Sequence, residues 1–385
     1  MSEQQFLSEH WQKQPLFMQG AIEVFEPSLS ADELGWLATL PDVESRLIFT
    51  ETAADRTTYR VQDGPFTEEE LASLPARNWA LMVQDVEKHL PDFRQFFAAV
   101  SFIPDWRIDD LMVSCAAPGG SVGPHRDNYD VFLCQGTGNR KWTLADPAAV
   151  TVDTSAQQLS LLQPFTPTAT FLAEPGDILY LPPGIPHWGI AGELCVTYSI
   201  GMRAPSKAEL ESGADRLYGD GTGKPVPESS ESIFYADADL QLAEAQPGRI
   251  SASAIQRLRS QELLDRGFSD EQLVTVLGSV VTDTKAWLTP DTPTEKEVAG
   301  IVSRFAGKSN LTVHGMARIA YCELAGIRLL FANGFVKELG QQDLDLVREL
   351  CSTRKVCMLT SGQHNDSTGL IEWLATKGVF DHDME

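Results

Sequence analysis

The sequence has no long apolar run. Its 385 residues contain no stretch of about 18 consecutive apolar residues, the length that a membrane-spanning helix requires. Residues 1–5 also lack the basic region followed by an apolar stretch that marks a secretory signal. We therefore expect a soluble, cytoplasmic protein.

Closely spaced cysteine pairs are missing as well. The six cysteines show no C-x-x-C motif and no zinc-finger spacing. Such a pattern is typical of buried free thiols in a reducing compartment. The cysteines are Cys115, Cys134, Cys195, Cys322, Cys351 and Cys357.

Positive charge is scarce. The chain has 30 lysines and arginines against 54 acidic residues, which gives a formal net charge of −24. This balance argues against general affinity for nucleic-acid phosphates and favours a basic partner. Acidity also promotes solubility, so the charge alone does not select one class of function.

The chain is longer than one core usually organises, so two or three domains are expected. Ser30 and Thr67 precede acidic first turns and predict two short helices before residue 95. Short apolar or alternating runs punctuated by glycine and proline fill residues 110–201. This texture predicts an all-β barrel or double-sheet jelly roll, the architecture of cupins, within a chain of α+β class.

Three residues have the composition of a facial metal triad. His125 and Asp127 are separated by one residue, and His187 lies far along the chain. Two histidines and a carboxylate on one side of Fe(II) leave coordination positions open for oxygen chemistry. Because residues i and i+2 of a β-strand project to the same face, we expect His125 and Asp127 on one strand, with Arg126 pointing away.

The segment that ends at His187 supports this interpretation. Residues 177–181 are largely apolar and run into Pro-Pro-Gly, which predicts a buried strand, a sharp turn and His187 at the next strand start. An isolated H-x-D occurs by chance in many chains, and a histidine near prolines is more often a surface or core residue. The pattern G-x5-P-x-G-x2-H at 176–187 is more restrictive, because it matches the second cupin signature.

Longer segments carry a family resemblance. They read His-Arg-Asp-Asn-Tyr-Asp-Val-Phe at 125–132, Gln-Gly-Thr-Gly-Asn-Arg-Lys-Trp at 135–142 and Tyr-Ser-Ile-Gly-Met-Arg-Ala-Pro at 198–205. With the 176–187 turn, they resemble the JmjC-type cupins called ribosomal oxygenases, and among these the bacterial ribosomal-protein arginine hydroxylases. His-Trp-Gln-Lys-Gln-Pro-Leu at 10–16 is similar to the family's N-terminal motif. The resemblance is strongest over residues 10–205 and weaker toward the C-terminus.

The resemblance implies that His125, Asp127 and His187 hold Fe(II), with 2-oxoglutarate and O2 as cosubstrates. The distal carboxylate of 2-oxoglutarate needs a cation, and arginine offers a planar, bidentate partner. Related enzymes carry a basic residue two positions before a tryptophan, which here is Arg140 before Trp142.

Strand alternation puts Arg140 and Trp142 on one face and Lys141 on the other, so we favour Arg140 as the anchor. Residues 136–139 are turn-like, however, and both cations also fit a hairpin as solvated charges. Ser114, in an apolar run, either donates its hydroxyl to the same carboxylate or is a small core residue.

Substrate contacts are less well defined. Asp109, Asp110 and Asp130 lie near the metal segment in sequence and are candidate partners for a cationic side chain, although acids at strand ends are ordinarily solvated. Tyr129 is a candidate to flank the substrate's alkyl chain, or a half-buried packing residue. Asn139 departs from the family pattern and has no interpretation from sequence alone.

Two further regions follow residues 1–205. Helical periods at 253–266 and 271–281 predict an amphipathic region over 206–280. The resemblance implies that this region forms a homodimer, and packing within one chain is the alternative. Helical patterns at 294–305, 341–350 and 367–377, with strand patterns at 317–323 and 327–331, predict a winged-helix-like domain over 281–385. Acidic residues outnumber basic ones there, which disfavours DNA binding.

We therefore predict an Fe(II)- and 2-oxoglutarate-dependent hydroxylase, and by resemblance its target is an arginine of large-subunit ribosomal protein sixteen. One alternative is a JmjC enzyme that hydroxylates histidine or another side chain, or demethylates lysine, in which case the pocket would hold few acids. Another is a non-enzymatic metal-binding cupin that regulates the C-terminal domain.

Overall fold

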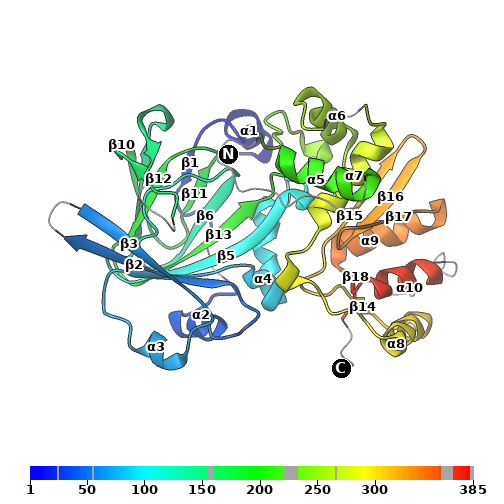
Figure 1. Ribbon diagram of the computed structural model, residues 1–385, viewed down its shortest axis with the longest axis horizontal. Helices are drawn as coiled ribbons and strands as arrows, with labels where there is room; N and C mark the ends of the chain where they lie inside the picture. The colour runs from blue at the N-terminus through cyan, green and yellow to red at the C-terminus, as the bar shows by residue number, and fades with distance from the viewer. Residues whose placement is uncertain are drawn as a thin grey trace. The chain divides into compact units, whose positions relative to one another are not determined.

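A computed structural model describes residues 1–23, 26–53, 56–153, 159–219, 233–264, 267–356 and 367–381. These residues form two compact units (Figure 1). The first unit comprises Met1–Ala99 and Ile108–Met202, and the second comprises Val100–Arg107 and Arg203–Glu385. The first boundary lies close to the predicted one at residue 205. The predicted division of the remainder into 206–280 and 281–385 stays a prediction, as does the environment of Cys357, which lies outside the described residues.

Two facing sheets organise the first unit. The larger has eight strands in the order β1-β11-β6-β13-β5-β4-β2-β3, and the smaller has three in the order β10-β7-β12. The strands are β1 (Leu16–Met18), β2 (Ser45–Ala53), β3 (Arg56–Asp63), β4 (Trp79–Val83), β5 (Ile108–Ala116), β6 (Val131–Thr137), β7 (Arg140–Ala145), β10 (Pro167–Ala173), β11 (Ile178–Leu181), β12 (His187–Ala191) and β13 (Cys195–Met202). A separate pair joins β8 (Thr151–Val152) to β9 (Leu162–Gln163). This is the predicted double-sheet arrangement.

The strand and turn predicted before His187 are confirmed. β11 is buried along its whole length, and β12 begins at His187. Gly184 between them has φ +80°, a left-handed conformation that glycine adopts without steric penalty. The predicted strand and turn therefore deliver His187 to the edge of the small sheet.

The connection between β6 and β7 is not the hairpin that residues 136–139 also permitted. β6 pairs with β11 and β13 in the large sheet, whereas β7 pairs with β10 and β12 in the small one. Gly138, with φ +60°, lets the chain change sheets, and an added Cβ there would lie 2.3 Å from the Leu194 carbonyl. Arg140 thus enters the interior between the sheets, and Lys141 stays exposed.

Short helices flank the first unit: α1 (Glu3–Glu9), α2 (Ala31–Leu37), α3 (Glu68–Ala72) and α4 (Val86–His89). The predicted caps are present, because the Ser30 and Thr67 side chains accept the N3 backbone N–H and the N3 glutamate reaches back. Such capping boxes satisfy N–H groups that a helix start leaves without partners.

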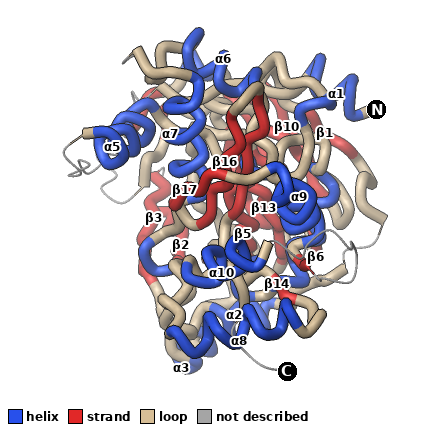
Figure 2. Tube along the Cα trace, turned by 90° about the vertical axis from the view of Figure 1, so that its right-hand side faces the viewer, coloured by secondary structure: helices blue, strands red, loops and turns tan. Residues whose placement is uncertain are grey.

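The second unit surrounds a three-stranded sheet with helices. Its helices are α5 (Lys207–Tyr218), α6 (Ala252–Ser260), α7 (Asp270–Thr282), α8 (Glu295–Ala306), α9 (Leu344–Thr353) and α10 (Thr368–Thr376). Its strands are β14 (Leu311–Thr312), β15 (Ile319–Leu324), β16 (Ile327–Ala332), β17 (Phe335–Glu338) and β18 (Lys355–Val356). Figure 2 shows β16 and β17 between α5–α7 on one side and α8 and α10 on the other.

Both groups of helices bury apolar residues on that sheet. Phe331 joins a core cluster with α6 and α7, and Leu330 joins another with α8, α9 and α10. Gly278 of α7 approaches so closely that an added Cβ would lie 2.4 Å from the Phe331 ring. These contacts show that α6 and α7 pack within their own chain.

One helix prediction needs correction. The helix expected over 253–266 ends at Ser260, and Glu262 takes a left-handed φ of +53°. The Leu263 N–H then bonds back to the Leu258 carbonyl, which closes the helix end in the Schellman manner. The helix and strand patterns predicted after residue 281 match α8, β15, β16, α9 and α10 to within a few residues. No helix among the described residues is long and apolar enough to cross a membrane.

Candidate metal centre

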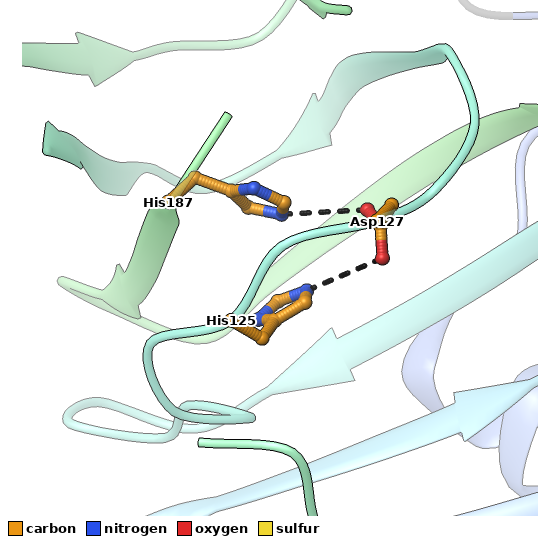
Figure 3. A group of neighbouring side chains, drawn as sticks. All are labelled: His125, Asp127 and His187. Atoms are coloured by element: carbon orange, nitrogen blue, oxygen red, sulfur yellow. Dashed lines mark ion pairs between the residues drawn. The ribbon is translucent and has the colours of Figure 1, made fainter. Parts of the chain in front are cut away.

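His125, Asp127 and His187 come together between the two sheets (Figure 3). One potential ligand atom from each lies within 4.8 Å of the others. The Asp127 carboxylate is 4.0 Å from His125 Nε2 and 3.6 Å from His187 Nε2. The three atoms can therefore face a single ion.

The strand expected to carry His125 and Asp127 is absent. Residues 117–130 form a loop in which His125 makes one isolated bridge to His187, with N–H to carbonyl distances of 3.0 and 2.8 Å. Gly123, with φ +85°, and Pro124, which has no N–H, interrupt any ladder before the bridge. Asp127 is held instead by its carbonyl, which accepts the Gly184 N–H at 2.8 Å.

Both imidazoles are oriented by the backbone. His125 Nδ1 lies 2.9 Å from the Gly123 carbonyl, and His187 Nδ1 lies 2.9 Å from the Ile185 carbonyl. A carbonyl only accepts, so each Nδ1 carries the proton and each Nε2 presents a lone pair toward Asp127. Metal-binding histidines use their second nitrogen in this way.

The electrostatics favour a neutral His187. The pKa of His187 is lowered to about 4, mainly by burial. The neighbouring His125 ring also lowers this pKa, and its effect exceeds the opposite effect of Asp127. The side chain is 2% exposed. At neutral pH the imidazole is therefore in the form that binds a metal ion. Two imidazole nitrogens and a carboxylate fit a divalent metal such as Fe(II).

Arg140 is the second feature of this interior. Its guanidinium is buried, and it donates to Ser114 Oγ at 3.2 Å and toward Cys195 Sγ at 3.7 Å. Its Nε has no hydrogen-bond partner, and no carboxylate pairs with it anywhere in the described ranges. A buried charge without an opposite charge is costly, so this arrangement indicates a site for an anion.

Trp142 connects Arg140 with the metal centre. The Arg140 guanidinium carbon lies 5.7 Å from the Trp142 ring centroid, and that ring lies 5.9 Å from the His187 ring. An added Cβ on Gly189 would lie 2.5 Å from the indole, so the glycine makes room for it. Arg140 pairs with Ala191, four residues beyond His187 on β12, about 13 Å along a strand. A small dicarboxylate and the arginine side chain can span that length.

Two of the candidate substrate residues lie together. An added Cβ on Gly201 would lie 2.8 Å from Asp110 Oδ1 and 3.9 Å from the Tyr129 ring. The Asp127 carboxylate is the main cause that raises the pKa of Tyr129 above its usual value, followed by burial and by Asp110 and Asp109. Tyr129 is nevertheless 42% exposed, so its ring sits where acidic groups meet solvent.

Asp130 is placed differently. It is fully buried and accepts hydrogen bonds from Tyr180 Oη at 2.5 Å and Gln12 Nε2 at 2.8 Å. Its carboxylate thus holds the Tyr180 and Gln12 side chains in place. Asn139, which the sequence left without interpretation, donates to the Glu193 carboxylate at 2.7 Å and fixes the turn between β12 and β13.

Sequence reasoning missed Cys195, Gln12 and Tyr180. The Cys195 thiol lies beside Arg140 because Ala116, its partner on β5, follows Ser114 by two residues on the same face. No local pattern marks these residues, since each contact joins segments far apart in sequence.

Comparisons with known proteins bear on the family and fold of this chain. The profile of the JmjC domain matches residues 95–210. The Escherichia coli ribosomal protein uL16 3-hydroxylase is 38% identical over 259 residues, which are 67% of this chain and 65% of that protein. A probable ribosomal oxygenase of Haemophilus influenzae is 32% identical over 72% of this chain and 67% of its own length.

Solved structures extend the likeness to nearly the whole chain. An X-ray structure of E. coli YcfD is 30% identical with a TM-score of 0.72, and the match covers 99% of this chain and 98% of YcfD. The complex of YcfD with cobalt and 2-oxoglutarate is 29% identical over the same shares, with a TM-score of 0.70. The fold is thus that of a JmjC cupin with mixed helices and strands. The chain belongs to the JmjC-domain ribosomal oxygenases.

Proposed function

We propose that the protein is an Fe(II)- and 2-oxoglutarate-dependent hydroxylase of an arginine side chain in ribosomal protein uL16. The observation that carries the proposal is the buried Arg140, which has no carboxylate partner among the described residues and lies on β7, the strand that pairs with β12, where His187 of the His125–Asp127–His187 cluster stands. A relative named as a uL16 3-hydroxylase and a complex of YcfD with 2-oxoglutarate support it.

His125, Asp127 and His187 would hold the metal from one side. Arg140 and Ser114 would bind the distal carboxylate of 2-oxoglutarate, which supplies the charge that Arg140 lacks. When bound, the iron, O2 and 2-oxoglutarate supply an oxidative decarboxylation, in which R–H, O2 and 2-oxoglutarate become R–OH, succinate and CO2. The chain's own task is to orient the target carbon and exclude water.

The residues around Tyr129 favour a cationic target. Asp110 and the Tyr129 ring both lie next to Gly201. Asp127 and Asp109 also raise the pKa of the Tyr129 hydroxyl. Acids attract and orient a guanidinium, whereas the ring offers an apolar wall for its alkyl chain. A hydroxylase of a neutral side chain would need few acids, so this rim supports arginine over histidine.

The test uses anaerobically purified protein with Fe(II), 2-oxoglutarate, air and recombinant uL16. Intact-protein mass spectrometry should show a gain of one oxygen on uL16, absent with Asp127→Ala and retained with Asp42→Ala, which removes an exposed carboxylate. A uL16 series in which each arginine is changed to lysine should abolish the gain at one position. Absence of both the gain and 2-oxoglutarate consumption would contradict the proposal and favour a metal-binding regulatory cupin.

We also propose two roles for the second unit, both from the family resemblance. The region from α5 to α7 forms a homodimer in addition to its contacts within the chain, and the module from α8 to α10 is winged-helix-like and contacts protein rather than DNA. Sedimentation equilibrium tests the first role, since a monomer at micromolar concentration would contradict it. Absence of duplex DNA binding at low salt is the expected result for the second.

A further inference from the structure

The N-terminal motif at residues 10–16 has no part in the chemistry proposed above. It nevertheless contacts the segments that carry the metal ligands. We propose that Gln12, Asp130 and Tyr180 form a clamp that positions Asp127 and His187 for the metal. The inference rests on the proposed metal site and extends it to positioning residues outside the ligand set.

Hydrogen bonds connect each of the three clamp residues to the other two. The Tyr180 hydroxyl donates to Asp130 Oδ1 at 2.5 Å and accepts the Gln12 backbone N–H at 2.8 Å. The Gln12 side-chain amide donates to Asp130 Oδ2 at 2.8 Å. Both oxygens of a fully buried carboxylate are thus satisfied by neutral donors, which is the strong, charge-assisted kind of hydrogen bond.

Each buried partner belongs to a segment that carries a ligand. Asp130 follows Asp127 by three residues in the same loop, and Tyr180 lies on β11, which leads through the turn at Gly184 to His187. At the metal end the two segments are joined by the His125–His187 bridge and by the Gly184 N–H to Asp127 carbonyl bond. The clamp joins them at the other end, so the ligand loop is fixed at two points.

The rest of the motif holds Gln12 in place. Trp11 is fully buried and stacks on Tyr180 with ring centroids 6.1 Å apart, and Phe6 meets the same ring edge-on at 4.8 Å. Leu16 of β1 pairs with Tyr180 in the large sheet. Gln12 itself has φ +55°, a left-handed conformation that is unfavourable for a residue with a Cβ. Its hydrogen bonds to Tyr180 and Asp130 offset that strain.

The chain offers a matched control in Tyr198. It is also fully buried, lies on β13 of the same sheet, and its hydroxyl accepts a backbone N–H, that of Leu29 at 2.7 Å. Tyr180→Phe and Tyr198→Phe therefore each remove one buried hydroxyl from the same sheet. They differ in their hydrogen bonds: the Tyr180 hydroxyl donates to Asp130 of the ligand loop, whereas the Tyr198 hydroxyl accepts from Leu29, which lies outside both ligand segments.

The experiment is a titration of metal-free protein with Co(II), followed by visible absorption bands that report the ligand geometry. Loss of groups that orient metal ligands typically weakens affinity about 10- to 100-fold. We expect Tyr180→Phe to raise the Co(II) Kd about 10-fold and to change the bands. Tyr198→Phe should leave both unchanged even where it lowers the melting temperature equally.

A rescue separates the clamp from general packing. Asp130→Asn removes the negative charge that strengthens both hydrogen bonds and should weaken Co(II) binding. Combining it with Gln12→Glu reverses donor and acceptor across the same contact and should restore binding at least in part. A failure of this rescue, together with identical Kd values for both tyrosine variants, would overturn the clamp alone. Wild-type protein that binds no Co(II) would overturn the proposed metal site as well.

Discussion

Buried arginines are treated differently in the two units. In the second unit, Arg107 is fully buried and donates to both oxygens of Asp237 at 3.0 and 3.1 Å. Arg257, 5% exposed, donates to Glu244 at 2.9 and 2.8 Å and also to Asp239. In the first unit, Arg140 is 7% exposed, and within the described part of the chain its guanidinium donates hydrogen bonds only to a hydroxyl and a thiol.

The difference separates structural arginines from one that serves a ligand. Arg107 and Arg257 are neutralised by the chain itself, so their charge is used to hold segments together. The Arg140 charge, in contrast, is left for a bound ligand to neutralise. Burial alone does not distinguish a structural arginine from a ligand-binding one. The group that accepts the guanidinium hydrogen bonds does distinguish them.

The largest effect is expected where the chain supplies both charges. Arg107→Met leaves the Asp237 carboxylate buried, 1% exposed, without its bidentate partner. Breaking a buried pair from one side costs about 3–5 kcal/mol, so the free energy of unfolding should fall by that amount. Urea denaturation measures it, and the kcat/KM per folded molecule should stay near wild type. A change below about 1 kcal/mol would mean that Asp237 is solvated or otherwise paired.

The opposite pattern is expected at Arg140. Arg140→Met removes a charge that no carboxylate of the described residues balances, so the protein should unfold at the same or higher urea concentration. Loss of a buried charge pair with the cosubstrate costs about 2–5 kcal/mol, which corresponds to a rise in the KM for 2-oxoglutarate of about 30-fold or more.

Lys141→Met is the matched control for that variant. It removes a neighbouring cation that points out of the same strand, and it should change neither the KM nor the stability measurably. An equal rise in the KM for 2-oxoglutarate in both variants would mean that Arg140 acts only through the overall positive potential of the region and does not bind the cosubstrate carboxylate directly.

Patterns local in sequence predicted much of this site. The buried strand, Pro-Pro-Gly turn and strand start fixed the position of His187, and period-two alternation placed Arg140 inside and Lys141 outside. Both predictions rest on backbone geometry that a few neighbouring residues determine.

Contacts between distant segments account for what the sequence did not predict. His125 and Asp127 were expected in a strand, but a single bridge to His187 and one bond from Gly184 hold them in a loop. Gln12 meets Asp130 and Tyr180 across more than 100 residues, and Asp130 meets Tyr180 across 50. Cys195 and Ser114 likewise approach Arg140 across the sheets. Their spacing along the chain carries no period that reveals them.

The smallest effect concerns pH and extends the contrast to titratable groups. In the first unit, burial keeps His187 neutral with a pKa of about 4, below its ordinary value of 6.5. The unfolded chain then binds more protons than the folded one between these values, so metal-free protein should lose stability as pH falls through that window. The slope near pH 5.5 should be about 1 kcal/mol per pH unit.

Glu244 of the second unit acts in a different window. Burial alone raises its pKa, but hydrogen bonds from Arg257 and Ser251 bring it below the ordinary 4.5. Its contribution is therefore complete above pH 4.5 and is lost only as pH falls further. Urea denaturation of metal-free protein at pH 6.5, 5.5 and 4.5 should show a shallower slope for His187→Gln and an unchanged slope for Glu244→Gln. Equal slopes for wild type and His187→Gln would mean that folding does not lower the pKa of His187.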